Sequence, residues 1–314
     1  MFLRERPVPK IILYNEASLK RLHPLSDLRP KIEEGLLKAW AGYNGECKVD
    51  RQLSTIDDKD IYIINDLCIP VGNTYFQIDS LILTKYVLLI LEIKNISGHL
   101  DISNEFGQLK RTLNGEVSAF ASPIAQCEKY RIHLSGVLKK MKIPVIPIEF
   151  LVVFTNPTSI LTASSSDTKV LEKTVKIESL LPKIHNLLNI FHTPHLSDKE
   201  LKRLSKLLLR EHKPFPINKI ELDFTKGVQC TNCKEFSMIR KQASWFCLKC
   251  SYFDKNAHVR AINDYFLLIA PTITNKQARD FLEISSPRTA QYLLNSMNLI
   301  QYGYGKGTYY KSPD

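Results

Sequence analysis

Apolar positions from Lys31 to Leu53 recur at the spacing of a helix that buries one face. Gly42 and Gly45 interrupt this pattern, so it predicts two helices rather than one. Glu46 then lies in the first turn of the second helix, where the helix dipole favours a carboxylate.

The stretch from Phe76 to Asn95 predicts two strands joined by a tight turn, the second strand being an almost unbroken apolar run. Such a run is typical of a strand buried on both faces of a sheet. Residues two apart in a strand point to the same face, so Glu92 and Lys94 emerge side by side. If the strands pair as a hairpin, Asp79 reaches that face too. Burying two carboxylates and an ammonium group costs several kcal/mol, which makes this cluster the strongest indication of a function.

The surrounding segments alternate strand and helix patterns. Ser122 and Pro123 are an N-cap and a first helical residue for a helix over 124–141. Helical spacing recurs in two later segments, 172–192 and 197–212. Strand patterns are present at 61–70, on both sides of Asn114-Gly115, and at 145–154. We therefore expect an α/β (α+β) fold, a mixed sheet flanked by helices.

The chain is basic, with a formal net charge of +11, which suggests an anionic partner. Nucleic acid is the first such partner and an acidic membrane surface the second, while a passive basic surface is the alternative. The longest apolar run is too short to cross a bilayer, and charged residues interrupt the N-terminus before a signal-peptide core. Seven cysteines, four of them in close pairs, favour a reducing compartment. We expect a cytoplasmic protein without a membrane partner.

Two C-x-x-C knuckles stand close together near residue 240. Cys230 and Cys233 form the first knuckle, and Cys247 and Cys250 form the second. Four thiolates on two tight turns can complete a tetrahedral Zn²⁺ site, so we predict a zinc ribbon whose metal is structural. A redox pair and four unrelated buried cysteines are the alternatives.

Residues 257–314 contain three helical patterns followed by a glycine-rich hairpin, the order of a winged helix-turn-helix. In that motif the N-terminal part of the third helix enters the major groove. A protein-binding or dimerisation module and a purely structural one are the alternatives. The expected DNA-binding residues lie on the third helix and at the tip of the wing: Ser286, Arg288, Thr289, Gln291 and Lys306.

Hydrolysis of a phosphodiester needs hard oxygen ligands for Mg²⁺ or Mn²⁺. Asp79 and Glu92 suit that metal, with the carbonyl of Ile93 a further ligand and Glu46 completing the shell. A cation near the attacking water or the developing charge adds to catalysis, and Lys94 suits that position.

The Asp-x(n)-Glu-x-Lys pattern resembles the PD-(D/E)xK nuclease superfamily, and residues 42–155 look like its NERD (nuclease-related) domain. Ile78 stands where the superfamily name has proline. The resemblance implies a restriction-endonuclease-like sheet, metal-binding roles for the residues at Glu46, Asp79 and Glu92, a catalytic role for Lys94 and a supporting one for Gln126. The matching stretches are Gly42-x-x-Gly45-Glu46, Gln77-Ile78-Asp79-Ser80, Leu91-Glu92-Ile93-Lys94-Asn95-x-Ser97-Gly98, Ser122-Pro123-x-x-Gln126 and Leu151-Val152-Val153-Phe154.

These patterns together predict a Mg²⁺-dependent DNA nuclease brought to its substrate by its C-terminal modules. A non-catalytic DNA-binding or regulatory protein with a degenerate nuclease fold is the alternative. The expected segments are an N-terminal extension (1–30), the nuclease-like domain (31–160), a helical connector (161–219), the zinc ribbon (220–256) and the winged helix (257–314).

Overall fold

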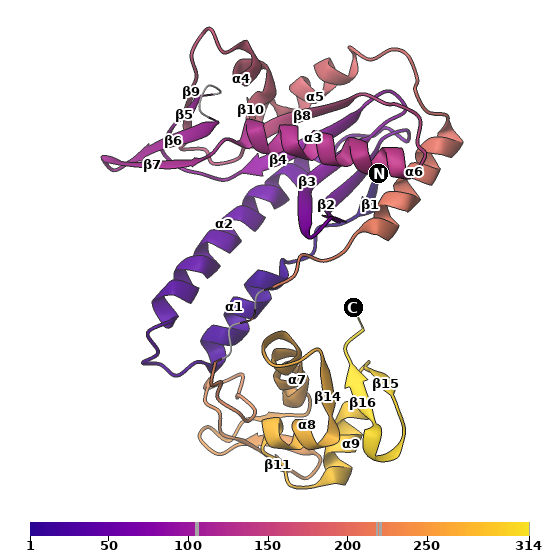
Figure 1. Ribbon diagram of the computed structural model, residues 1–314. Coiled ribbons are helices and arrows are strands. Elements are labelled where there is room, and N and C mark those ends of the chain that lie inside the picture. The colour runs from indigo at the N-terminus through magenta and orange to yellow at the C-terminus, as the bar shows by residue number, and fades with distance from the viewer. Residues whose placement is uncertain (104–106, 218, 220–221, 314) are drawn as a thin grey trace. The chain divides into compact units, whose positions relative to one another are not determined.

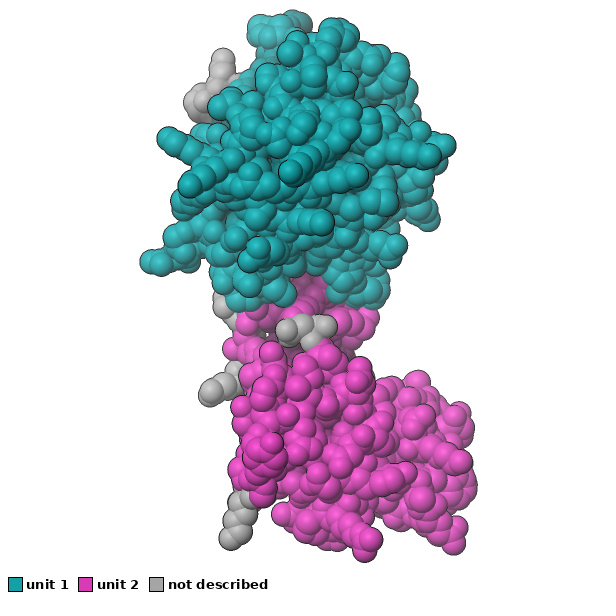
Figure 2. Space-filling model, turned by 90° about the vertical axis from the view of Figure 1, so that its right-hand side faces the viewer, with its two compact units in different colours: residues 1–8, 40–216 teal, residues 9–39, 217–314 magenta. Residues whose placement is uncertain are grey.

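The computed structural model describes residues 1–103, 107–217, 219 and 222–313, with only the backbone of Ser103 and Lys306. The chain forms two compact units, coloured separately in Figure 2. Unit 1 comprises Met1–Val8 and Trp40–Pro216, and unit 2 comprises Pro9–Ala39 and Ile217–Asp314. Helix α2 (Arg29–Leu53) therefore begins in unit 2 and ends in unit 1. The finer division into five segments stays a prediction.

Unit 1 is built on a six-stranded mixed sheet (Figure 1). Strands β2, β3 and β4 are antiparallel neighbours, and β4 pairs in parallel with β8. The two outer strands, β1 and β10, are short and also pair in parallel. The sheet order is β1 (Phe2–Arg4), β2 (Tyr62–Val71), β3 (Thr74–Leu83), β4 (Leu88–Lys94), β8 (Ile148–Phe154) and β10 (Thr174–Lys176).

Helices cover both faces of this sheet. On one face α3 (Pro123–Lys140) packs on β3, β4 and β8, and α6 (Asp198–Glu211) packs on β2; Figure 1 shows α3 crossing the strands. On the other face lie α2 and α5 (Leu180–Leu188). Successive residues of β4 alternate between the two cores, Ile90 facing α3 and Leu91 facing α2. The mixed sheet flanked by helices, with its second hairpin strand buried on both faces, is thus confirmed.

A smaller sheet completes unit 1. Asn114 and Gly115, at φ 52° and 81°, form the tight turn that their sequence predicts. The Ser122 hydroxyl accepts a hydrogen bond from the backbone N–H of Ala125, so the predicted helix cap is confirmed. The strand order is β7 (Glu116–Ala121), β6 (Gln108–Leu113), β5 (His99–Ser103) and β9 (Ile160–Thr162).

The predicted break in the segment 31–53 is wrong, because α2 is one continuous helix. Glu46 accordingly lies deep inside this helix and not in a first turn. Gly42 has open space around its α-carbon, but a β-carbon at Gly45 would lie 2.7 Å from Cβ of Asn95. Gly45 is therefore a packing residue, which lets α2 approach the end of β4.

The segment 172–192 is also not one helix. It contains the end of α4 (Thr168–Lys173), strand β10, a 3-10 turn η1 (Ile177–Ser179) and α5. The edge strand forms because β8 offers unpaired backbone groups beside it, a tertiary effect that helical spacing does not reveal. Among the described residues, no helix combines the length and apolarity needed to cross a membrane.

Unit 2 joins a small ribbon to a helical module through one core. Trp245 and Cys247 of the ribbon pack in the same cluster as Ile262 and Phe281 of the helices. The ribbon strands are β11 (Met238–Lys241), β12 (Ser244–Cys247) and β13 (Phe253–Asp254). The helical module follows as α7 (Ala257–Leu268), β14 (Thr272–Thr274), α8 (Asn275–Leu282), α9 (Pro287–Asn295), β15 (Ile300–Tyr302), η2 (Gly305–Gly307) and β16 (Tyr309–Lys311).

The N-terminal helix α1 (Lys10–Arg21) is part of unit 2 and packs on α7. Its last residue, Arg21, is buried and pairs with Asp264 at 2.8 Å. The Arg21 guanidinium also donates to the carbonyl of Thr225 at 2.8 Å and stacks on the ring of Phe281 at 4.4 Å. One side chain thus ties α1 to α7, α8 and the segment that enters the ribbon.

Candidate active site

The predicted carboxylates and lysine meet at the end of β4. Lys94 Nζ donates to Glu92 Oε1 at 2.6 Å and to Gln126 Oε1, on the second turn of α3, at 3.2 Å. Asp79 Oδ2 accepts from the backbone N–H of Ile93 at 2.7 Å, in the gap where β3 and β4 separate. The side chain of Ile93 turns to the opposite core.

Glu92 is 2% exposed, and the structure describes no hydrogen-bond partner for its Oε2 among the residues that it covers. Burial, followed by the charge of Asp79, raises the pKa of Glu92 to about 8. A buried carboxylate oxygen without a partner is costly, unless a cation or a proton compensates it. At Oε2 of Glu92, either a proton or a bound cation can supply this compensation.

Asp79 occupies a break in the β2–β3 ladder. Asn65 pairs with Ser80 and Leu67 with Ile78, but Asp66, opposite Asp79, has a left-handed φ of 53° and forms no ladder pair. The carbonyl of Asp79 instead accepts a hydrogen bond at 2.8 Å from Arg6. The pKa of Asp79 is raised, because the effect of burial exceeds that of the hydrogen bond from the backbone N–H of Ile93, which lowers it.

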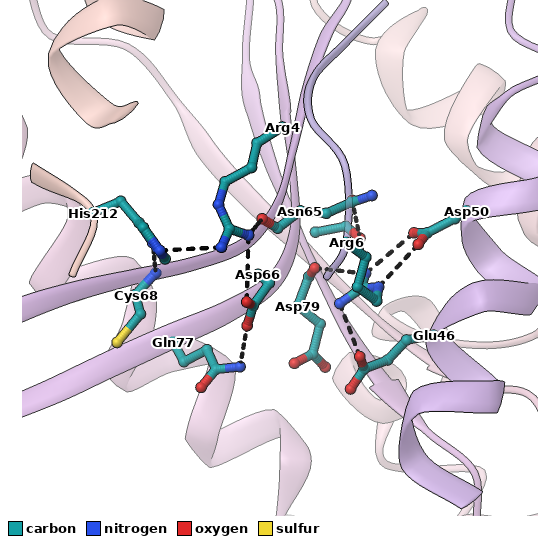
Figure 3. Close-up of polar contacts among 11 residues, drawn as sticks. Arg4, Arg6, Glu46, Asp50, Asn65, Asp66, Cys68, Gln77, Asp79 and His212 are labelled. Carbon is teal, nitrogen blue, oxygen red and sulfur yellow. Dashed lines mark hydrogen bonds and ion pairs between the residues drawn. The ribbon is translucent and has the colours of Figure 1, made fainter. Parts of the chain in front are cut away.

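Arg6 was not predicted to take part in any site. Its side chain is only 3% exposed, and its guanidinium contacts Glu46 at 2.9 Å and Asp50 at 2.9 Å. It also donates to Ser80 Oγ at 2.9 Å, and Figure 3 shows it above the carboxylates of Glu46 and Asp79. Nothing in the sequence marks Arg6, because its partners come from segments far along the chain.

Glu46 enters the site from the face of the sheet opposite α3. Its pKa is raised to about 7 by burial and by the charge of Asp79, while Arg6 lowers it. Gly45 makes this placement possible, because a β-carbon there would also lie 2.6 Å from Thr155 Oγ1. The charge of Asp79 thus raises the pKa of both Glu46 and Glu92. Among the described residues, however, the ligand atoms of these three carboxylates do not all lie within 4.8 Å of one another, as those of the four cysteines in unit 2 do.

A groove of about 700 Å³ lies beside Asp50, an ion-pair partner of Arg6. Asn95, directly after Lys94, lines one side, and Lys48 and Arg51 of α2 line the other. The two basic side chains suit a polyanionic chain, although Asp50 lines the same groove and offsets part of their charge.

A second group, beside the first in Figure 3, centres on Asp66. Asp66 pairs with Arg4 at 3.3 Å and accepts a hydrogen bond from Gln77. His212 contacts Arg4 at 3.1 Å, and burial followed by the charge of Arg4 lowers the pKa of His212. These contacts hold the N-terminal segment, which carries Arg6, against β2 and β3.

The four knuckle cysteines of unit 2 converge as predicted, with their Sγ atoms within 4.8 Å of one another. Cys230 and Cys250 are 3.7 Å apart at Sγ, and Cys233 and Cys247 are 3.5 Å apart. A tetrahedral Zn²⁺ with bonds of about 2.3 Å separates its sulfur ligands by about 3.8 Å. The cluster therefore fits a zinc ribbon.

The surroundings of the second knuckle stabilise its thiolates. In the first knuckle a backbone hydrogen bond lowers the pKa of Cys233, but burial and the neighbouring cysteines raise it to about 12. Although burial raises the pKa of Cys247, the Ser237 hydroxyl and the N–H groups of Cys250 and Lys249 lower it to about 6. Ser251, which ends that turn, has a φ of 59°. Because the thiolate is the form that binds a metal, this arrangement favours metal binding at neutral pH.

The residues expected to bind DNA differ in exposure and in their contacts. Ser286 caps α9 by accepting from the N–H of Thr289, and Arg288 is exposed beside it. Gln291 instead contacts the Tyr310 hydroxyl of β16. The side chain of Lys306 lies outside the described residues.

Comparison with protein families supplies an independent assignment of part of the first unit. The family model described as NERD, nuclease-related domain, matches residues 41–155. These residues run from the groove in α2 to the end of β8, and they include the cluster at Glu46, Asp79 and Glu92. Comparisons with curated proteins and with solved structures found no match. The chain therefore contains a nuclease-related domain of the NERD family at residues 41–155.

Proposed function

We propose that this protein is a metal-dependent nuclease that hydrolyses phosphodiester bonds of DNA. The observation that supports it best concerns Oε2 of Glu92, next to Asp79 and Lys94: this buried oxygen has no hydrogen-bond partner within the described part of the chain. A salt-bridged structural cluster would satisfy that oxygen, whereas a metal site leaves it for the cation.

Glu46, Asp79 and Glu92 are the residues that would hold Mg²⁺ or Mn²⁺, with the carbonyl of Ile93 a further oxygen. All are hard oxygen donors, and burial raises the pKa of all three carboxyl groups, which a bound cation would reverse. When bound, such a cation lowers the pKa of a water and offsets negative charge at the phosphoryl group.

Lys94 supplies a fixed positive charge at the reaction centre. Burial lowers its pKa, but Glu92 and Asp79 raise it by more, so the ammonium group keeps its proton. Glu92 and Gln126 hold Nζ from two sides, and Gln126 is oriented in turn by a hydrogen bond to the Tyr130 hydroxyl at 2.8 Å. The position suits stabilisation of the attacking water and of the charge that develops on the phosphate.

Unit 2 would bring the domain to DNA. Its sheet order β14–β16–β15 beside α7, α8 and α9 supports the assignment of a winged helix. Arg288 is exposed in the first turn of α9, the part of such a helix that enters the major groove. The four-cysteine cluster would hold a structural zinc ion that stabilises this unit.

The test is cleavage of labelled linear and circular DNA by the full chain with Mg²⁺, Mn²⁺ or EDTA. Asp79→Asn and Lys94→Ala should abolish cutting and leave DNA affinity nearly unchanged. Asp101→Asn, on β5 and exposed, is the matched control and should cut normally.

Cutting that needs a divalent metal and is lost in both site variants supports the proposal. Binding without cutting by every form, in every metal, would instead establish the non-catalytic DNA-binding alternative. Arg288→Ala should weaken DNA binding and reduce the slope of affinity against salt by about one phosphate contact. An unchanged affinity of Arg288→Ala for DNA would show that α9 does not contact DNA through this residue.

A further inference from the structure

Arg6 lies between Glu46 and Asp79, which we assign to the metal site, and Asp50, which we do not. Its Nη1 contacts Glu46 Oε2, and its Nε and Nη2 bind both oxygens of Asp50 at 2.9 and 3.1 Å. The same Nη2 reaches the carbonyl of Asp79 and Ser80 Oγ. The guanidinium is thus surrounded by oxygen atoms, the surroundings that a hard divalent cation also requires.

The charges at the site balance with one divalent cation. When ionised, Glu46, Asp50, Asp79 and Glu92 carry four negative charges, and Arg6 and Lys94 carry two positive charges. Two negative charges remain uncompensated, which is the charge of one Mg²⁺ or Mn²⁺. Asp66, the next carboxylate, is already paired with Arg4.

We propose that the site binds a single divalent cation and that Arg6 permanently occupies the place of a second one. This inference rests on the proposed nuclease function, since it concerns the same carboxylates. Arg6 is then a positioning residue: it holds one oxygen of Glu46 and leaves the other to the cation.

The N-terminal segment that carries Arg6 is anchored to the sheet, and this holds Arg6 in place. Strand β1 pairs in parallel with β2, and the carbonyl of Met1 accepts a hydrogen bond from the backbone N–H of Ile63 at 3.0 Å. A guanidinium does not lose its proton in proteins, and five donors in a rigid fork match the oxygen atoms around it. A second cation would have to displace this buried side chain and pull the segment away from the sheet.

The experiment counts Mn²⁺ ions bound to the zinc-loaded full chain without DNA, by isothermal titration and by the electron paramagnetic resonance signal of free Mn²⁺. Wild type should bind one Mn²⁺. Arg6→Gln should bind two, because removal of the guanidinium leaves Glu46 and Asp50 without their cation. Arg6→Lys keeps the charge and should bind one. Arg203→Gln, a control at an exposed arginine of α6 that contacts the carbonyl of Met141, should also bind one.

Two Mn²⁺ on wild type would overturn the inference while leaving the nuclease proposal intact, because two-metal hydrolysis is also known chemistry. No Mn²⁺ on wild type would instead refute the metal-dependent nuclease itself. A single Mn²⁺ on Arg6→Gln, bound as on wild type, would show that Arg6 does not occupy a cation position. If Arg6→Gln fails to fold, the counts for wild type and Arg6→Lys decide, and two ions on either would refute the inference.

Discussion

Gly42 and Gly45 lie one turn apart in α2 but have opposite surroundings. Apart from the surrounding helix backbone, no atom of the described residues lies within 4 Å of a β-carbon at Gly42, whereas a β-carbon at Gly45 would be 2.7 Å from Asn95 Cβ and 2.6 Å from Thr155 Oγ1. We predict that the same substitution, glycine to alanine, stabilises the protein at Gly42 and destabilises it at Gly45.

The magnitudes follow from these contacts. In a helix interior alanine is favoured over glycine by about 0.8–1 kcal/mol, so Gly42→Ala should stabilise by about that amount. Gly45→Ala gains the same stabilisation from helix propensity, but it places the alanine Cβ about 1 Å closer to Asn95 Cβ than the normal carbon–carbon contact distance of roughly 3.5–4.0 Å. Overpacking of this kind costs about 1–3 kcal/mol, so the net loss is about 1 kcal/mol and the two variants differ by about 2 kcal/mol. Rotation of the Asn95 side chain gives no relief, because Cβ is fixed to the backbone.

The functional effect should exceed the effect on stability. Glu46 follows Gly45 directly, so a shift of α2 by about 1 Å carries its carboxylate away from Asp79 and Glu92. A misplacement of that size lowers catalysis about 10²-fold. The assays are urea unfolding, with hydrogen exchange of residues 62–94 to assign the change to unit 1, and metal-dependent DNA cleavage. If Gly45→Ala proved as stable and as active as Gly42→Ala, the close approach of α2 would be refuted.

Three further predictions concern unit 2. Arg21→Met removes one of the two ion-pair partners of the buried Asp264 carboxylate, the other being Lys20, and should lower the free energy of unfolding by about 3 kcal/mol. Adding Asp264→Asn should recover part of this loss. An unchanged urea midpoint for Arg21→Met would contradict the pairing. Burial, followed by the charge of Arg240, lowers the pKa of His258 to about 4 from 6.5. The unfolded chain then binds a proton that the folded chain excludes, so stability should fall by up to about 3 kcal/mol between pH 6.5 and 4, and His258→Gln should flatten that slope in pH-dependent denaturation. If the slope were the same in this variant, His258 would not be its source. Cys250→Ser should release zinc measured by elemental analysis and unfold unit 2 by circular dichroism, and full retention of zinc and fold would rule out the four-thiolate site.

Local sequence pattern was sufficient to predict those features whose interacting residues are neighbours in the chain. The turn at Asn114-Gly115, the cap at Ser122 and the knuckles at Cys230 and Cys247 all follow from short-range geometry, and the structure contains each of them. The two-residue period of a strand likewise sufficed to place Glu92 beside Lys94.

Local pattern failed where a residue acts through a distant one. Gly45 reads as a helix breaker, yet its role is to meet Asn95 and Thr155, about 50 and 110 residues away along the chain. Strand β10 exists because β8 has a free edge, and helical spacing in the same segment concealed it.

What the sequence by itself determined is the chemistry at the end of β4: which carboxylates, which lysine, and on which face of the strand. Only the tertiary structure decided what surrounds that chemistry. Arg6 reaches Glu46 and Asp50 because β1 adds to the sheet beside β2, and α1 joins unit 2 because Arg21 finds Asp264. The physical reason is that a charged side chain has no preference that can be read from its neighbours in sequence. Its place is set by the long-range partners that compensate its burial.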